Sequence, residues 1–364
     1  CIYMMKLKRL AAAAAALIAA AGLLLTACAD TSQETSQEPS GEMEKETDEG
    51  IRIGITFDTF VLERWTRDRD VFVDTARKLG ATVDVQTANG DVEKQKAQIR
   101  KFTEENMDAI VVVATDCYAL SEEVKDARNK GIQVISYDRL IQGEQTDLYI
   151  TVDNEMVGAL MAQSIKENLP DGGNVVMICG PEADSNSMDV VNGFEAELGE
   201  GPWKIVYKSH VKSWTPENGT QAVADAFAGT EEQIDAVMCG NDGLAGYVIR
   251  SLSERQLAGD VVVVGQDADL EACQRIVEGT QAMTVFKPIN DLAKEAAECT
   301  VKLAKGEQIT GDLLDASDVK ENEDGQKVPY YGLEPVAVTK ENMDSVIISS
   351  GFHSREEVYL NVEN

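Results

Sequence analysis

Metal-binding patterns of histidine and cysteine are absent from this sequence. Its two histidines, His210 and His353, stand far apart, and none of its seven cysteines occurs in a Cys-x-x-Cys pair. A zinc site needs such side chains at close spacing, so we expect no metal ion. Five cysteines lie far apart in apolar segments and are interpreted as buried small hydrophobes, with one bridged pair as the alternative: Cys117, Cys179, Cys239, Cys273 and Cys299.

Signatures of the common catalytic and nucleotide-binding sites are also missing. The chain has no G-x-S-x-G elbow, no G-x-x-x-x-G-K-[ST] loop and no G-x-G-x-x-G turn after a strand. These patterns mark acyl transfer, nucleotide hydrolysis and hydride transfer. Asp138 with Asp267 as an acid/base pair, or Lys287 as a Schiff-base nucleophile, would lack the usual companions. We therefore expect a protein that is not an enzyme and holds no cofactor.

Basic residues are scarce relative to acidic ones. The chain has 33 lysines and arginines against 64 aspartates and glutamates, which gives a formal net charge of -31. Such a surface repels the phosphate backbone of nucleic acids and the headgroups of anionic lipids. Nucleic acid is therefore excluded as a partner, and we interpret the acidity as a contribution to solubility.

Residues 1–27 have the pattern of a cleavable export signal. Three basic residues within positions 6–9 precede an alanine-rich apolar run that ends at Cys28, which is the order found in secretory signals. The tetrapeptide LTAC at residues 25–28 resembles the lipobox of bacterial lipoproteins, whose cysteine is lipidated and becomes the first residue. An uncleaved signal anchor with an incidental cysteine is the alternative.

Residues 28–50 contain almost no large apolar side chain. Such a segment cannot offset the entropy lost on ordering, so we predict a disordered tether. A lipid at one end and a folded body at the other place the protein at the outer face of the cytoplasmic membrane, on the cell surface or in the periplasm. The lipid anchor would be its only contact with the membrane.

From residue 51 onward, short β-branched runs alternate with longer amphipathic stretches. This alternation predicts parallel strands joined by helices, and the continuous apolar runs indicate that both faces of each sheet are covered. Two similar α/β halves follow. The predicted strands are residues 52–57, 82–88, 109–115 and 133–138 in the first half and 174–180, 205–211, 236–242, 261–267 and 282–287 in the second; the predicted helices lie near 63–79, 91–105, 118–129, 155–168, 186–198, 216–228, 243–255 and 288–305.

Polar side chains gather where these strands end. Ligands of open parallel sheets bind beyond the carboxyl ends of the strands, so we expect the polar groups of both halves to converge on one cleft. A polar residue after a strand is often only a helix cap. Capping does not explain Arg139, Lys287, Trp65 or Trp214, which stand at the same kind of position.

Nine short segments, taken with their order and spacing, closely resemble the family of bacterial D-xylose-binding periplasmic proteins. The likeness runs from about residue 51 to residue 353. The segments are residues 62–65 (LERW), 68–70 (DRD), 137–139 (YDR), 214–218 (WTPEN), 241–242 (ND), 265–269 (GQDAD), 279–281 (GTQ), 287–288 (KP) and 351–353 (GFH).

The resemblance implies the type I periplasmic-binding-protein fold, in which two doubly wound parallel-sheet lobes are joined by a three-strand hinge. The first lobe would comprise 51–153 and about 288–325, and the second 154–287 and about 326–364. The implied ligand-binding residues lie on both lobes, and the segment around Asn186 matches most loosely: Arg64, Trp65, Asp138, Arg139, Asn186, Trp214, Asn241, Asp267 and Lys287.

The chemistry of these residue types suits a sugar. Hydroxyl groups both donate and accept hydrogen bonds, so carboxylates would accept from them, Arg64, Arg139 and Lys287 would donate to them, and the two asparagines would do both. Trp65 and Trp214 would sandwich the apolar C–H faces of the ring. Trp203 is interpreted as core packing.

The resemblance further implies a solute-binding lipoprotein that captures D-xylose and delivers it to an ABC permease and its ATPase. We expect it to act as a monomer. The alternative is a receptor for glucose, ribose, arabinose, galactose or the sugar-like signal autoinducer-2, because fold alone does not fix the ligand. A sugar-responsive repressor is disfavoured, because a signal peptide stands where a helix-turn-helix should precede the core. An extracellular enzyme acting on sugars would require two carboxylates that flank the scissile bond in an open groove.

The substitution Cys28→Ala tests the lipid anchor. Because it removes the acylated thiol, we expect the protein to be released or mislocalised, while the purified protein keeps its sugar affinity. Fractionation of membranes and medium measures the first effect, and titration with sugar the second. Unchanged membrane retention would remove the lipoprotein interpretation.

Overall fold

The computed structural model describes residues 50–309 and 319–362. The predicted signal peptide, Cys28 and the tether up to residue 49 lie outside the described residues. Among the described segments, no helix is both long enough and apolar enough to cross a membrane.

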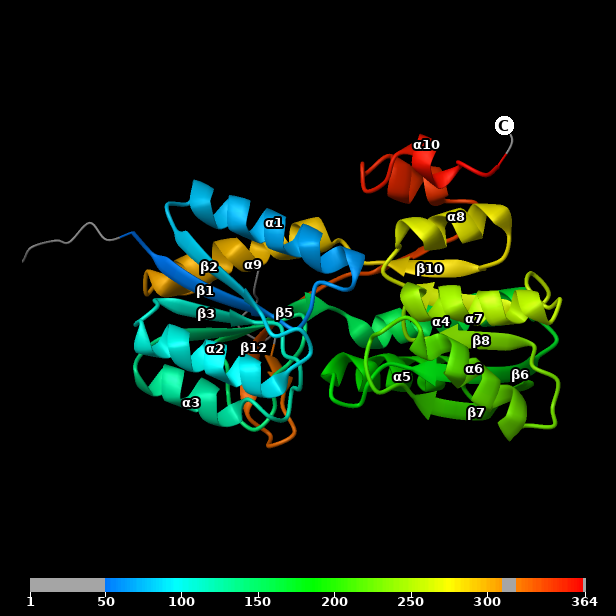
Figure 1. Ribbon diagram of the computed structural model, residues 1–364, viewed down its shortest axis with the longest axis horizontal. Coiled ribbons are helices and arrows are strands. Elements are labelled where there is room, and N and C mark those ends of the chain that lie inside the picture. The colour runs from blue at the N-terminus through cyan, green and yellow to red at the C-terminus, as the bar shows by residue number, and fades with distance from the viewer. Residues whose placement is uncertain (1–49, 310–318, 363–364) are drawn as a thin grey trace, which may run out of the picture. The chain divides into compact units, whose positions relative to one another are not determined.

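The first lobe is built on a seven-stranded sheet (Figure 1). Its strands follow the order β11-β12-β5-β4-β3-β1-β2, and those from β1 to β5 pair in parallel. The elements are β1 (Arg52–Phe57), α1 (Glu63–Lys78), β2 (Thr82–Thr87), α2 (Val92–Glu104), β3 (Ala109–Val112), α3 (Ser121–Asn129), β4 (Gln133–Tyr137), β5 (Leu148–Val152), α9 (Ile289–Ala304), β11 (Val319–Glu321) and β12 (Lys327–Leu333).

The second lobe is built on a six-stranded sheet with the order β13-β10-β9-β8-β6-β7. Only the pairing of β13 with β10 is antiparallel in this sheet. The elements are α4 (Asn154–Asn168), β6 (Gly173–Cys179), α5 (Ser185–Leu198), β7 (Trp203–His210), α6 (Asn218–Gly229), β8 (Ala236–Cys239), α7 (Asp242–Glu254), β9 (Val262–Gln266), α8 (Leu270–Glu278), β10 (Met283–Phe286), β13 (Val336–Val338), the π-helical turn η1 (Asp344–Ile348) and α10 (Arg355–Val358).

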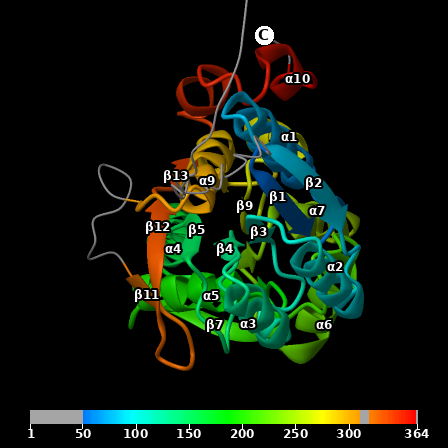
Figure 2. The ribbon, with the colours of Figure 1, turned by 90° about the vertical axis from the view of Figure 1, so that its left-hand side faces the viewer.

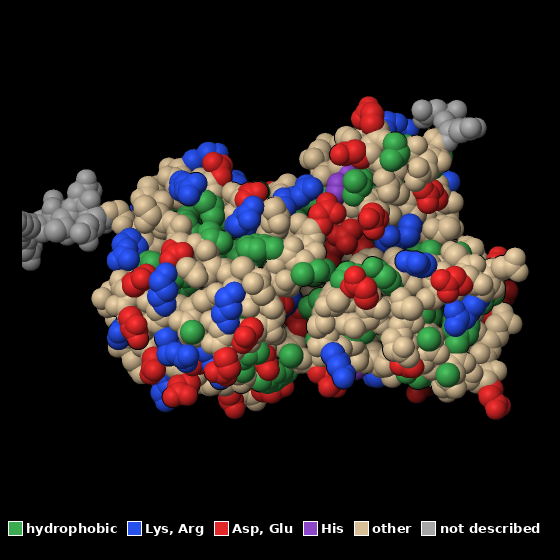
Figure 3. Space-filling view, viewed as in Figure 1, with side chains coloured by type: hydrophobic (Ala, Val, Ile, Leu, Met, Phe, Trp, Pro, Cys, Tyr) green, Lys and Arg blue, Asp and Glu red, His purple; other side chains and the backbone are tan. Residues whose placement is uncertain are grey.

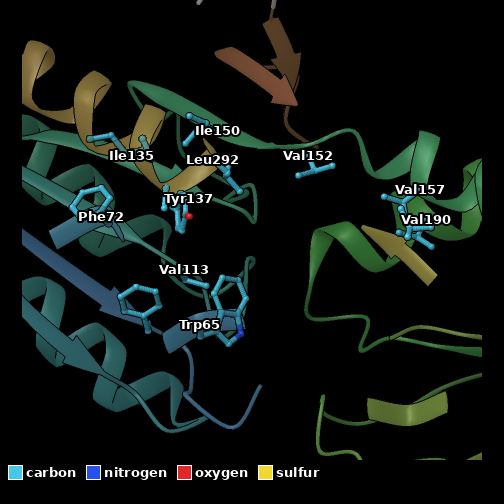
Figure 4. Packing of buried hydrophobic residues seen from close by; sticks show 14 of the residues in the cluster. Trp65, Phe72, Val113, Ile135, Tyr137, Ile150, Val152, Val157, Val190 and Leu292 are labelled. Atoms are coloured by element: carbon cyan, nitrogen blue, oxygen red, sulfur yellow. The ribbon is translucent and has the colours of Figure 1, made fainter. Parts of the chain in front are cut away.

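Alternate residues of the central strands bury into opposite layers. In β1 and β3, Ile53, Ile55 and Val111 belong to the largest apolar cluster, whereas Ile110 and Val112 pack with the residues of α2 and α3. The second sheet divides in the same manner between the sides of α4 and α6. Figure 4 shows the largest cluster from Phe72 to Val190. The prediction of two doubly wound α/β lobes is confirmed.

The helices α4 and α5 pack backbone to backbone through two glycines. A Cβ atom on Gly158 would lie 2.0 Å from the carbonyl oxygen of Val190, and one on Gly193 would lie 1.9 Å from that of Glu155. This close approach fixes the start of α5. Asp184 caps that start by accepting a hydrogen bond from the backbone N–H of Asn186 at 3.0 Å. The packing therefore places the side chains of Asp184 and Asn186 at the edge of the second sheet.

The chain crosses between the lobes three times, after β5, after β10 and after β12. Our boundary near residue 326 for the last crossing is wrong, because β12 pairs in parallel with β5 from Tyr330↔Tyr149 to Leu333↔Val152. Figure 2 shows β12 beside β5. The sheets are also mixed rather than purely parallel, since β11 and β13 pair in antiparallel fashion at their edges. The predicted elements did not include β5, β11, β12, β13, α8, η1 or α10.

Candidate functional site

One cavity lies between the carboxyl ends of the strands of both lobes. Its space measures about 460 Å³, including the part open to solvent. All nine predicted site residues line it: Arg64, Trp65, Asp138, Arg139, Asn186, Trp214, Asn241, Asp267 and Lys287. The structure thus brings together residues that are more than 200 positions apart in the sequence.

An ion pair in the first lobe forms one wall. Arg64 Nη2 lies 2.8 Å from Asp138 Oδ1, and both side chains are about 95% buried. Asp68 lies 3.4 Å from Arg64 Nε and also accepts a hydrogen bond from the Tyr137 hydroxyl. Burial opposes the ionisation of Asp138, but Arg64, Lys287 and Arg139 outweigh it and hold the pKa of this carboxyl below its usual range. Asp138 is therefore an acceptor at neutral pH.

The backbone of Asp138 has a left-handed conformation. Its φ is 67°, a value that side chains other than glycine rarely adopt and that is found where the surroundings impose it. Its carbonyl oxygen accepts hydrogen bonds from Thr151 Oγ1 at 2.8 Å and Asn186 Nδ2 at 2.9 Å. Asn186 Nδ2 also lies 3.1 Å from Asp138 Oδ2, so a residue of the second lobe holds this turn of the first.

Arg139 links the two lobes. Its Nη1 donates to Asp58 at 2.9 Å and to the carbonyl of Ala114 at 2.6 Å, both in the first lobe. Its Nε lies 2.8 Å from Asp184 of the second lobe. Asp184 Oδ2 in turn accepts a hydrogen bond from Trp214 Nε1 at 2.9 Å. Asp184 therefore joins a first-lobe cation to a second-lobe indole.

The second ion pair of the cavity is Asp267 with Lys287. The atoms Asp267 Oδ1 and Lys287 Nζ lie 3.2 Å apart, and the side chains are 8% and 6% exposed. Asp267 and the following Ala268 have φ values of 103° and 53°. The turn is held by Ala268 N–H, which donates to Thr284 Oγ1 at 3.1 Å. The carboxylate of Asp267 is thus aimed into the cavity by a backbone shape that the neighbouring strand maintains.

Several buried polar atoms at the cavity have no hydrogen-bond partner among the described residues. They are Trp65 Nε1, Ser187 Oγ, Asn241 Nδ2 and Gln266 Oε1, and Asp267 Oδ1 has only its ion pair. A buried polar group left unpaired costs about 1–3 kcal/mol. Donors and acceptors are both represented, so the cavity is suited to a neutral ligand that offers both.

The two cavity tryptophans have different surroundings. Trp65 is 1% exposed, and the Arg64 guanidinium lies 4.2 Å from its ring centroid. Trp214 is half-buried and lies over Gly180, where a Cβ atom would approach its Cη2 to 2.2 Å. Trp203 packs against the largest apolar cluster and donates to the carbonyl of Leu169 at 2.9 Å.

Three residues with polar side chains also line the cavity and were not among the predicted site residues: Asp184, Ser187 and Gln266. Gln266 ends β9 directly before Asp267, so its place at a strand end was a usable signal. Asp184 resembles an ordinary helix cap, and Ser187 lies inside α5 without any pattern.

The five cysteines named above are free and buried, and burial raises the pKa of Cys179, which lines the cavity, to about 12.

Acidic side chains gather beside the cavity, in the hollow where the start of α1 faces α7 and α8 (Figure 3). Asp242 accepts hydrogen bonds from Thr284 Oγ1 at 2.6 Å, Gln281 Nε2 at 2.8 Å and Asp269 N–H at 3.2 Å. Burial raises the pKa of Asp242 from 3.8 to about 7, against the opposing effect of Arg275. Within the described residues, no group of three or more histidine, cysteine or acidic side chains is arranged to hold a metal ion.

Comparison with known proteins gives matches along most of the chain. The family model described as "Periplasmic binding protein domain" matches residues 53–308. The chain is 39% identical over 313 residues to the D-xylose-binding periplasmic protein of Haemophilus influenzae, covering 85% of this chain and 92% of that protein. It is 38% identical over 315 residues to the protein of the same name from Escherichia coli, with the same coverage.

Solved structures share the fold. An ABC transporter solute-binding protein from Clostridium phytofermentans, with β-D-glucose bound, matches with a TM-score of 0.73 and 25% identity. The match covers 84% of this chain and 99% of that one. A carbohydrate transporter solute-binding protein from Chloroflexus aurantiacus, in complex with D-glucose, gives a TM-score of 0.75 at 24% identity and supports the fold alone.

Asp242 should make the stability of the unliganded protein depend on pH. Because its folded-state pKa is raised, the folded protein retains a proton that the unfolded chain releases, so stability falls as pH rises from about 4 to 7. We expect the melting temperature to fall by about 3 to 8 °C across this interval, and the fall to be smaller in Asp242→Asn. Calorimetry from pH 4 to 8 measures it. The exposed Asp260→Asn is the control, and equal profiles for both variants would contradict the assignment.

Proposed function

The chain belongs to the periplasmic-binding-protein family, and from this premise we propose that it captures D-xylose between its lobes and delivers it to an ABC importer. It does so as a binding protein, without chemical turnover. The importer's permease and ATPase are its protein partners. We further propose that Cys28 carries a lipid that holds the monomer at the outer face of the cytoplasmic membrane.

The unpaired polar atoms of the cavity carry the proposal. A pentopyranose presents hydroxyl groups that each donate one hydrogen bond and accept others, which matches the unpaired donor Asn241 Nδ2 and the acceptors Gln266 Oε1 and Asp267 Oδ1. A purely apolar ligand would leave Asn241 Nδ2 and Gln266 Oε1 unpaired. An anion without hydroxyl groups would offer no donor to Gln266 Oε1 or to Asp267 Oδ1. A neutral polyhydroxyl compound is the class that satisfies them.

The choice of xylose among sugars comes from the relatives. Two proteins named as D-xylose-binding are 39% and 38% identical to this chain over most of both lengths. The residues that the resemblance selects also line one cavity in this chain. Arg64, Asp138, Asp267 and Lys287 are therefore our candidates for direct contacts with the sugar hydroxyls, with Trp65 and Trp214 facing the ring.

Hydrogen bonds to these charged groups would supply the affinity. Each contributes about 1.5–3 kcal/mol, and part of the sum is offset by the lost translational freedom of the sugar and by ordering of the lobes. A net value of about -8 kcal/mol corresponds to a dissociation constant of about 1 μM. Release to the permease then requires the lobes to reopen, a hinge motion about the three crossing segments.

Isothermal titration of the full chain in detergent tests the proposal. Xylose, glucose, ribose, arabinose and galactose are titrated in parallel. Tight binding of xylose with weak binding of the others supports both the class and the ligand. Preference for another sugar retains the receptor function and overturns the assignment of xylose, and no binding of any of the five overturns the function.

The substitution Asp267→Asn tests the role of the second ion pair. Asparagine tolerates a positive φ and preserves the shape of the side chain, but it removes the charge and leaves Lys287 unpaired. We expect xylose affinity to fall about 10- to 100-fold, and the melting temperature of the unliganded protein to fall as well, because the buried ammonium of Lys287 loses its partner. Asp260→Asn, at an exposed position of the same lobe, serves as the control. A large loss of stability with unchanged affinity would recast Asp267 as structural.

A further inference from the structure

Among the contacts between the lobes that lie outside the cavity, one joins α1 to the segment after η1. Arg67, on the first-lobe helix α1, donates from Nη1 to the carbonyl oxygen of Phe352 at 2.9 Å. Its guanidinium carbon also lies 4.2 Å from the centroid of the Phe352 ring. Neither residue lines the cavity. A cation therefore contacts both the backbone and the ring of one residue near the C-terminus.

Phe352 belongs to the second lobe. Together with Ile347 and Val358 it packs in an apolar cluster with residues of α8, and its ring lies 4.9 Å from that of Phe286 at the end of β10. The Arg67 contact therefore joins α1 of one lobe to the outer layer of the other. A rigid-body opening of the lobes would move these two layers apart.

The next residue reaches the turn that carries Asp267. His353 is 6% exposed, and its Nε2 lies 2.8 Å from the carbonyl oxygen of Ala268. Since a carbonyl oxygen only accepts, Nε2 carries the proton and donates. Burial lowers the pKa of His353, which keeps the ring neutral in this tautomer. Ala268 follows Asp267 in the left-handed turn of the cavity wall.

We propose that Arg67 and the Phe352-His353 pair form a closure latch, which raises sugar affinity by stabilising the closed lobes and the Asp267 turn without touching the sugar. The inference rests on the function proposed above. Arg67 stabilises the closed arrangement through Phe352, and His353 separately holds the turn through Ala268. Both are positioning residues for the site.

The latch raises the affinity for sugar by increasing the fraction of protein molecules whose lobes are closed. When only a fraction of the protein is in the binding-competent state, the apparent dissociation constant rises in inverse proportion to that fraction. A contact that is made only between closed lobes increases this fraction equally for every sugar. Loss of the Arg67–Phe352 contact, which acts through closure alone, should therefore weaken all sugars by the same factor, whereas a change at the Asp267 turn alters their ranking.

Glu63 orients the latch from the same helix. Its Oε1 lies 3.9 Å from Arg67 Nη2, and its Oε2 lies 3.5 Å from the backbone nitrogen of Leu270 at the start of α8. Arg67 and Glu63 are 30% and 47% exposed, respectively, so solvent screens this pair and the Phe352 contact is the stronger one. The Arg67 part of the latch thus consists of its half-buried guanidinium and of the carbonyl and ring of Phe352 that it contacts.

Arg67→Ala measures the latch, and Arg77→Ala is its matched control. Arg77 lies in the last turn of the same helix and is exposed. In Arg67→Ala we expect the dissociation constant to rise about three- to tenfold for each sugar that binds, with a faster dissociation rate. Arg77→Ala should stay within about twofold of the unmodified protein. Arg67→Lys, which keeps the charge, and Phe352→Leu, which keeps the carbonyl acceptor, should give intermediate losses.

A double-mutant cycle tests the link to the turn. His353→Phe keeps an aromatic ring and removes the N–H donor. If His353 acts through Asp267, its effect on affinity shrinks in the Asp267→Asn background, because both substitutions disturb one interaction. Full additivity of the two losses would overturn this part of the inference, as would unchanged affinity in His353→Phe alone.

The outcomes separate the two proposals. Sugar binding by the unmodified chain, with equal affinity in Arg67→Ala and Arg77→Ala, overturns the latch and leaves the proposed function standing. A change in the ranking of sugars in Arg67→Ala also overturns it, because the residue would then act on the cavity. Failure of the unmodified chain to bind any sugar overturns the function first.

Discussion

The burial of charge between the two lobes is the constraint on which the rest of the structure depends. Arg64 with Asp138 and Asp267 with Lys287 are almost fully removed from solvent, and a buried charge is tolerated only when it is paired and hydrogen-bonded. Each carboxylate stands in a left-handed turn at a strand end. Parallel sheets bring these ends together, and the crossings place the two sets opposite one another.

The hydrogen bonding of the neutral amides around these charges is incomplete within the described residues. Asn241 uses its side-chain oxygen to cap α7 and leaves its amide nitrogen without a partner among the described residues. Gln266 donates from its amide nitrogen to the carbonyl oxygen of Gly240, and its side-chain oxygen has no partner among the described residues. The sugar we propose would complete this network, so binding and closure become one event. The proposed latch at Arg67 adds a contribution to the binding free energy that is the same for every ligand.

Apolar runs predicted the buried parallel strands, and polar residues after them predicted the edge where ligands bind, because both are local signals. The nine site residues came instead from the resemblance to a known family, since Arg64, Trp65 and Asn186 lie in helices rather than at strand ends. The edge strands β11 and β13 had no such signal, because each has only three residues and is partly exposed. The strand β12 is longer, but its place in the sheet depends on its pairing with β5, from Tyr330 with Tyr149 onward. Ser187 and Asp184 reached the cavity through the close packing of α4 and α5, which only the three-dimensional arrangement reveals.

A crystal structure of the full chain with D-xylose would show whether a sugar pairs the polar atoms of the cavity. We expect a single sugar ring between the lobes, with hydroxyl oxygens within hydrogen-bond distance of Asn241 Nδ2, Gln266 Oε1 and the carboxylates of Asp138 and Asp267. Those atoms would then all be paired. A cavity filled only by water in crystals grown at saturating xylose, or a sugar bound elsewhere with these atoms still unpaired, would contradict it.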